Sequence, residues 1–72
     1  MTQTANTIRI TLNGEAREIG ATTVAELIAS LGLAGDRVAV EQNLEIVPRA
    51  SWQQATVREG DRFEVVHFVG GG

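Results

Sequence analysis

The sequence predicts an α+β fold in which a mixed sheet of four to five strands carries one helix packed across one face. Three observations predict it: an alternating strand followed by a hairpin signal, one short amphipathic stretch, and strand-like segments in the second half. The 72 residues allow one small domain. A hydrophobic fraction of 43% is ordinary for a globular protein and too high for a disordered one.

The first strand is predicted over residues 7–12, which alternate apolar and polar side chains and so bury one face. Asn13-Gly14 follows, a dipeptide typical of two-residue hairpin turns because both residues tolerate positive φ. Residues 15–19 form the returning strand. We expect residues 1–6, which are polar and precede the hairpin, to be a disordered N-terminus.

A short helix is predicted over residues 24–31, where apolar side chains recur at the i, i+3, i+4, i+7 spacing of one helical face. Thr23 and Glu26 have the spacing of a capping box, and Gly32 is a natural C-cap. A helix of about two turns is not stable alone in water, so it must pack on the sheet.

Three further strands are predicted in the second half, over residues 37–41, 44–47 and 62–69. Residues 42–43 form the turn between the first two, and Pro48 ends the second because it has no backbone N–H to donate. A hairpin, a helix and more strands in so few residues favour a β-grasp fold. In that fold the first and last strands lie side by side and parallel in the middle of the sheet.

The last strand divides its side chains between two faces. Phe63 and Val65 have one parity, and Val66 and Phe68 have the other. If the first pair faces the helix, then Val66 and Phe68, with Val69 at the end of the strand, form an exposed apolar patch for docking a partner. The alternatives are that this pair packs on side chains of neighbouring strands, or that a bulge exchanges the two parities.

A glycine tail, Gly70, Gly71 and Gly72, follows the domain of residues 7–69. Without side chains the tail can pass through a narrow channel, and three extended residues reach about 10 Å. We expect this tail to be flexible and to present the Gly72 carboxylate to the active site of a partner. The alternative is an inert, loose end, which short glycine runs often form.

The composition excludes several classes of function. The chain has no cysteine, so thiolate metal sites and cysteine nucleophiles are absent from it. The net charge is −3 with acidic and basic residues mixed, which argues against nucleic-acid binding. No apolar run has membrane-spanning length, and a cytoplasmic monomer is expected. We interpret His67 as a sheet-surface residue, Trp52 as a lid on the edge of the core, and Glu59 and Asp61 as turn residues without a metal.

The stretch from Val38 to Arg49, with Trp52 after it, Glu59-Gly60-Asp61 and the glycine tail, resembles the ThiS family of sulfur carrier proteins of thiamine biosynthesis. The resemblance covers the chain from residue 7 onward and implies a ubiquitin-like β-grasp. Its most specific part is the Asn-x-x-Ile-Val-Pro-Arg stretch with the tryptophan. Leu44 departs from the pattern, because a glycine is common after that asparagine.

The resemblance also implies a chemistry. An E1-like, ThiF-like adenylyltransferase would activate the Gly72 carboxylate with ATP and Mg²⁺, and a persulfide donor would convert it to a thiocarboxylate. A ThiG-like thiazole synthase would then take the sulfur into the thiazole ring. The protein itself would be a carrier and cosubstrate, with no active site, metal or bound cofactor.

Three other functions stay open from the sequence. The same thiocarboxylate could serve a pterin acceptor, as in a small subunit of molybdopterin synthase. Gly72 could instead be joined to a lysine of another protein, as in a protein modifier. A β-grasp interaction module with an inert tail would lose nothing when Gly71 and Gly72 are deleted.

Overall fold

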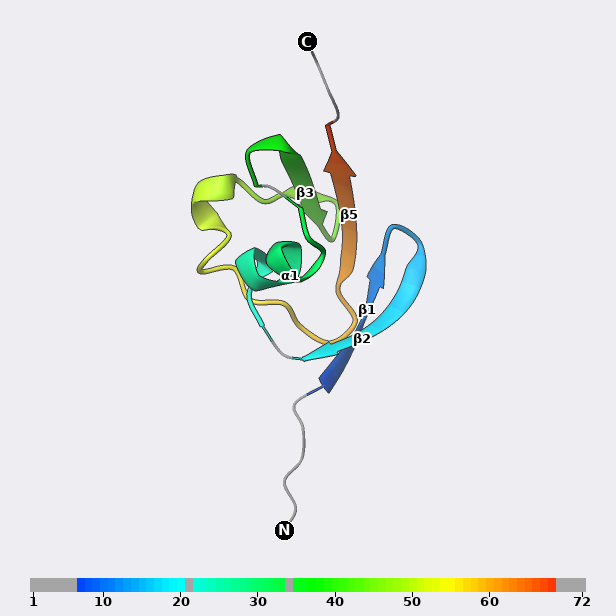
Figure 1. Cartoon of the computed structure of the whole chain (residues 1–72). Helices are drawn as coiled ribbons and strands as arrows, with labels where there is room; N and C mark the ends of the chain where they lie inside the picture. Colours follow the sequence, from blue (N-terminus) through cyan, green and yellow to red (C-terminus); the bar gives the residue numbers. More distant parts are fainter. Residues whose placement is uncertain (1–6, 21, 34, 69–72) are drawn as a thin grey trace.

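The computed structural model describes residues 7–20, 22–33 and 35–68 (Figure 1). Over these ranges the chain forms five strands, one α-helix and two 3-10 turns. In chain order they are β1 (Thr7–Leu12), β2 (Glu15–Gly20), α1 (Val24–Ser30), η1 (Gly35–Arg37), β3 (Val38–Gln42), β4 (Glu45–Ile46), η2 (Arg49–Ser51) and β5 (Arg62–His67).

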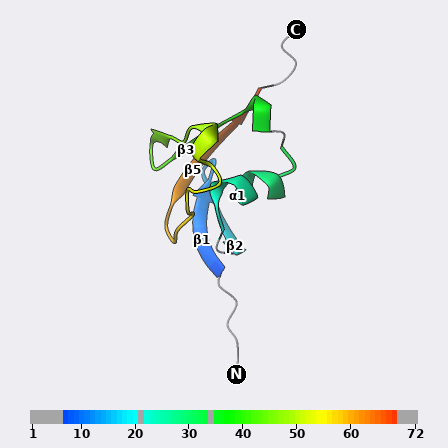
Figure 2. The same cartoon turned by 90° about the vertical axis from the view of Figure 1, so that its left-hand side faces the viewer.

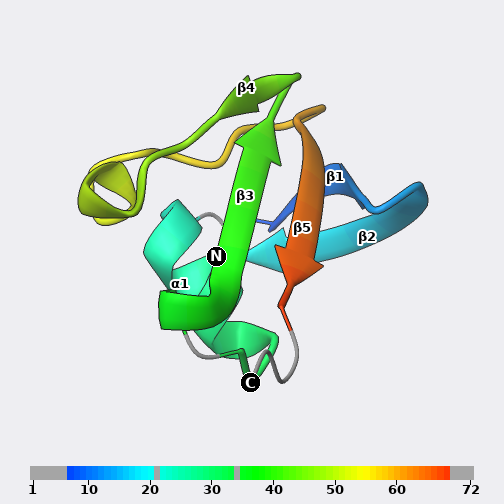
Figure 3. The same cartoon turned by 90° about the horizontal axis from the view of Figure 1, so that it is seen from above.

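The five strands form one mixed sheet in the order β2-β1-β5-β3-β4. β5 lies in the middle, parallel to β1 and antiparallel to β3, and Figure 3 shows β3 and β5 side by side. α1 lies across one face of the sheet and leaves the opposite face open (Figure 2). The predicted α+β, β-grasp architecture is confirmed, with the first and last strands parallel at its centre.

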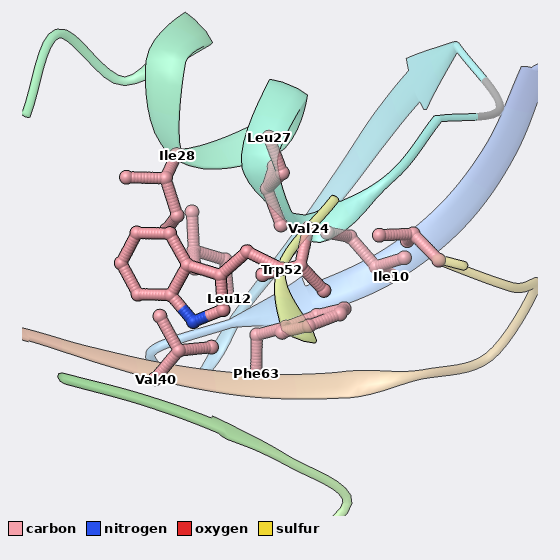
Figure 4. Packing of buried hydrophobic residues seen from close by; sticks show 9 residues of the cluster. Ile10, Leu12, Val24, Leu27, Ile28, Val40, Trp52 and Phe63 are labelled. Atoms are coloured by element: carbon pink, nitrogen blue, oxygen red, sulfur yellow. The ribbon is translucent and has the colours of Figure 1, made fainter. Parts of the chain in front are cut away.

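The core lies between α1 and the sheet, and Figure 4 shows the helix side chains above those of the central strands. Trp52, predicted as a lid on the edge, is only 6% exposed and belongs to this core; its Nε1 donates to the Val47 carbonyl at 2.9 Å. Complete burial of one large apolar side chain contributes about 1.5–3 kcal/mol. The buried residues are Ile10, Leu12, Val24, Leu27, Ile28, Val40, Trp52, Val57 and Phe63.

α1 begins where the capping residues predict. The Thr23 hydroxyl accepts a hydrogen bond from the Glu26 backbone N–H at 3.3 Å, and the Glu26 carboxylate accepts from the Thr22 hydroxyl. The helix ends one residue earlier than predicted, at Ser30, with Leu31 as its C-cap. Gly32 follows at φ 75°, a conformation that costs glycine little.

The second hairpin is displaced by one residue from its predicted position. Its turn is Asn43-Leu44 rather than residues 42–43, so β3 extends to Gln42 and β4 has only two residues. Both turn residues have positive φ, 54° and 72°, as a two-residue hairpin turn of type I′ requires. Leu44 therefore adopts a left-handed conformation that costs a residue with a β-carbon about 1–2 kcal/mol.

Candidate functional site

β5 leads to the glycine tail, and both of its edges are hydrogen-bonded. β3 opposes it over five residue pairs and β1 over two. The strand ends at His67, earlier than predicted, but the Phe68 N–H still donates to the Arg37 carbonyl at 2.8 Å. The segment from which the tail leaves is thus held on a fixed path as far as Phe68.

Asn13, in the first hairpin turn, binds β5 where β1 has already ended. Its backbone N–H donates to the Phe63 carbonyl at 2.9 Å. Its side-chain Oδ1 accepts from the Val65 N–H at 2.8 Å, and Nδ2 donates to the Val65 carbonyl at 3.2 Å. The side-chain amide therefore continues the pairing of β1 with β5 by one more step.

Asn43, in the second hairpin turn, binds the start of β5 from the opposite edge. Its backbone N–H donates to the Arg62 carbonyl at 2.7 Å, and its Oδ1 accepts from the Arg62 N–H at 2.9 Å. Its Nδ2 donates to Asp61 Oδ1 at 3.0 Å. Two turn asparagines therefore hold the strand from its two sides.

Asp61, just before β5, is buried, with 8% of its surface exposed. Besides Asn43, the Gln42 Nε2 and the Arg58 backbone N–H each donate to its Oδ2 at 2.8 Å. Burial raises the pKa of this carboxyl. The hydrogen bonds from Asn43, Arg58 and Gln42, with the charge of Arg58, outweigh that effect and hold the pKa below its usual value. The carboxylate therefore ties the second hairpin to the turn of residues 58–61, beyond the turn position that the sequence indicated.

The side chains of β5 divide between the two faces as predicted. Phe63 is fully buried and Val65 is half-buried, whereas Val66 and Phe68 are 52% and 55% exposed. The two exposed side chains thus form an apolar patch that no described residue covers, immediately before the glycine tail. Of the predicted docking residues, these two are placed by the structure.

Two further exposed apolar side chains were missed by the sequence reasoning. Leu44 and Ile46 in the second hairpin are 74% and 65% exposed. Ile46 is opposite Glu41 across the hairpin and therefore lies on the open face of the sheet. From the sequence, neither residue was assigned to a face of the sheet.

The other predicted site residues lie outside the described residues. They are Val69 and the three glycines of the tail, Gly70, Gly71 and Gly72. The expected disorder of residues 1–6 lies outside them too. The roles of these residues stay predictions.

The remaining candidates show no catalytic arrangement. His67 is exposed on the sheet, as expected. In residues 7–20, 22–33 and 35–68, no three histidine, aspartate or glutamate side chains gather where a metal ion could bind. No helix in the same ranges is long and apolar enough to cross a bilayer.

Comparison with known protein families shows which family this chain belongs to. The sequence model of the family described as "ThiS family" matches residues 10–72, which is nearly the whole chain. The chain belongs to the ThiS family. The match runs through β5 and on to Gly72, so it includes the tail that the resemblance singled out.

Two relatives of this chain differ from each other in length. The sulfur carrier protein ThiS of Bacillus subtilis is 40% identical over 50 residues, covering 69% of this chain and 76% of the relative. The thiazole synthase of Paramagnetospirillum magneticum is 47% identical over 66 residues, covering 90% of this chain. This chain spans only about a fifth of the length of the thiazole synthases that it matches.

Solved structures agree with the fold. The crystal structure of the thiamine biosynthesis protein ThiS from Geobacter metallireducens has a TM-score of 0.77 at 33% identity, covering 90% of this chain and all of that one. A designed protein based on human erythrocytic ubiquitin has a TM-score of 0.53 at 20% identity, which bears on the fold alone. The fold of this ThiS-family chain is therefore a ubiquitin-like β-grasp.

Proposed function

We propose that this protein is a sulfur carrier of thiamine biosynthesis that holds sulfur as a thiocarboxylate on Gly72. The observation that carries the proposal is the family match, which extends to Gly72 itself. The geometry supports it, because β5 is bonded on both edges and the apolar pair Val66 and Phe68, which precedes the tail in the sequence, is exposed. An enzyme acting on Gly72 would rest on this pair and on Val69.

The proposed chemistry begins with activation, because a carboxylate is a poor acyl donor. An E1-like adenylyltransferase joins the Gly72 carboxylate to the AMP part of ATP, with Mg²⁺ on the phosphates, and releases pyrophosphate. The terminal sulfur of a persulfide then attacks the acyl carbon and AMP leaves. A thiol cleaves the remaining S–S bond, which frees the thiocarboxylate. ATP and Mg²⁺ are bound by the activating enzyme, and the carrier supplies only its own acyl group.

We propose thiazole synthase as the acceptor of the sulfur. The support is that a segment similar to 90% of this chain occurs within longer proteins named thiazole synthase. Joining two partners in one chain raises the effective concentration of each for the other, which favours binding between proteins that act together. A molybdopterin synthase acceptor has no such support here. The cytoplasm, where ATP is available, is the proposed place of action.

Intact-mass measurement tests the carrier chemistry. The protein is incubated with ATP, Mg²⁺, an E1-like adenylyltransferase and a persulfide source, beside a variant that lacks Gly72. We expect the mass gain of one oxygen replaced by sulfur in the first protein alone. An unchanged mass, in a mixture that converts the Bacillus subtilis ThiS, would exclude the proposed function and favour an interaction module with an inert tail.

A further inference from the structure

The first hairpin turn, Asn13-Gly14, places an asparagine before a residue whose backbone nitrogen has no side chain beside it. Both residues have positive φ, 50° and 84°, and both are exposed. A β-carbon built on Gly14 would meet no atom within 4 Å, so the space around this residue is open. Attack of the Gly14 nitrogen on the side-chain carbonyl carbon of Asn13 closes a succinimide ring. The turn therefore joins a reactive amide to an unhindered nucleophile.

The fold restrains this amide, because both of its polar atoms are hydrogen-bonded to one residue of β5. Asn13 Oδ1 accepts from the Val65 N–H at 2.8 Å, and Nδ2 donates to the Val65 carbonyl at 3.2 Å. The two bonds fit a planar amide that spans both backbone groups. Attack at Asn13 Cγ makes that carbon tetrahedral and moves Oδ1 and Nδ2 out of the plane. Pairing with Val65 and the reaction therefore exclude each other.

The second hairpin turn supplies an internal comparison. Asn43-Leu44 has a similar backbone conformation, with φ of 54° and 72°. The nitrogen after Asn43 belongs to leucine, whose side chain hinders attack on the neighbouring amide. The Asn43 amide is also held by a buried carboxylate, since its Nδ2 donates to Asp61 Oδ1 at 3.0 Å. Of the two turn asparagines, Asn13 is therefore the reactive one.

We propose that Asn13 is a site of spontaneous chemical modification, deamidation through a succinimide, and that opening of its bonds to Val65 sets the rate in the folded protein. The Gly14 nitrogen loses its proton and bonds to Asn13 Cγ, the Cγ–Nδ2 bond breaks, and ammonia leaves. Water then opens the ring at one of its two carbonyls. Opening at the main-chain carbonyl gives isoaspartate, and opening at Cγ gives aspartate.

The isoaspartate product cannot restore the pairing with Val65. Its main chain runs through the β-carbon, which lengthens a two-residue turn by one methylene. Its carboxylate has no hydrogen to donate to the Val65 carbonyl. β3 still pairs with β5 on the other edge. Modification at Asn13 therefore loosens the central strand on its β1 side alone.

Peptide mapping of the full chain tests the proposal, in mildly alkaline buffer with and without denaturing guanidinium chloride. Conversion is measured as the mass gain of one NH replaced by O, and isoaspartate is counted by enzymatic methylation with S-adenosylmethionine. In denaturant we expect Asn13 to convert while Asn43, in the same samples, stays unchanged. In the folded protein, conversion of Asn13 should be about tenfold slower, because two hydrogen bonds must open first.

Gly14→Ala is the matched variant, and it is compared in denaturant, where loss of the turn cannot affect the result. The added β-carbon should slow the conversion of Asn13. For the unchanged chain below the unfolding transition, hydrogen exchange supplies a second measurement. The exchange rate of the Val65 amide and the conversion rate of Asn13 should rise with denaturant in equal proportion.

Three results would overturn the proposal. Equal conversion of Asn13 in the folded and the unfolded chain would show that the bonds to Val65 give no protection. Equal rates for Gly14→Ala and the unchanged chain in denaturant would exclude attack by the Gly14 nitrogen. Constant conversion of Asn13 while Val65 exchange accelerates would exclude opening of this pairing as the controlling step. Replacement of oxygen by sulfur at Gly72 gives a different mass change, so these outcomes do not depend on the proposed carrier chemistry.

Discussion

The two hairpin turns share their backbone conformation but not their second residue. The first is Asn13-Gly14, with φ of 50° and 84°, and the second is Asn43-Leu44, with φ of 54° and 72°. The residue with the greater freedom at positive φ is present in one turn and replaced by an exposed leucine in the other. Both turns nevertheless close with two residues.

What the turns share is the asparagine, and in both it binds β5. Each asparagine donates its backbone N–H to a β5 carbonyl and accepts a β5 N–H at its Oδ1. The first position of each turn is therefore constrained by contacts to the central strand, and the second only by its own conformation. This difference predicts which substitutions are severe and which are mild.

The largest effect is expected for Asn43→Ala, a loss of about 2–3 kcal/mol in the free energy of unfolding. The substitution removes the side-chain hydrogen bonds to Arg62 and Asp61, takes one donor from a buried carboxylate, and puts alanine at φ 54°, a conformation that asparagine tolerates better. Urea unfolding followed by Trp52 fluorescence measures it. Asn43→Gly is the control, because it relieves the backbone conformation and isolates the lost hydrogen bonds. A loss below about 0.5 kcal/mol would contradict the role given to Asn43.

Asn13→Ala should cost less, about 1–2 kcal/mol, because its two side-chain bonds to Val65 are exposed and serve no buried charge. The more specific measurement is hydrogen exchange. The Val65 amide should lose protection selectively, relative to amides of β5 that are bonded to β3. Unchanged protection at Val65 would show that the strand pairing does not depend on this side chain.

Low pH should reduce the free energy of unfolding by a smaller amount, through protonation of Asp61. Its pKa is depressed in the folded state, so its contribution to stability is complete above the unfolded pKa, about 3.9, and is lost as the pH falls through the folded value. Protonation weakens its hydrogen bonds but keeps the side chain in place, which limits the loss. Urea unfolding between pH 7 and pH 2 should show a shallower decline for Asp61→Asn than for the unchanged protein. Parallel curves would refute the assignment.

The smallest expected effect is an increase in stability. Leu44→Gly should stabilise the protein by about 0.5–1 kcal/mol, because relief of the left-handed conformation exceeds the entropy that glycine adds to the unfolded chain. Gly14→Ala is the reciprocal variant and should destabilise by a similar amount. A β-carbon at Gly14 would meet no atom within 4 Å, so only conformation is changed. If Leu44→Gly also lowers the free energy of unfolding, the Leu44 side chain stabilises the hairpin.

Most of the fold could be predicted from the sequence because its local signals agree. Alternation placed β1, the apolar helical spacing with Thr23 placed α1, and the Asn13-Gly14 pair placed the first turn. The second turn was misplaced by one residue because Leu44 gives no sign of positive φ. Tertiary contacts with β5 require the conformation there, and no local pattern reports them.

The candidate site, like the fold, could be predicted from the sequence only in part. The exposed pair Val66 and Phe68 followed from strand parity alone. The position of Ile46 opposite Glu41 did not, because it depends on the register between β3 and β4. The buried contacts of Asp61 gave no signal in the sequence, since two of its donors, Gln42 and Asn43, are on a distant segment. The chemistry assigned to Gly72 still depends on the family match and its test.

The double pairing of β5 also has a mechanical consequence. A pull directed along the strand from Phe68 would stress the hydrogen bonds to β1 and to β3 at the same time and in shear, so none of them could open before the others. The same force applied across a sheet edge would open its bonds one after another. A partner that draws the chain beyond Phe68 into a narrow channel could therefore keep it under tension without unravelling the domain.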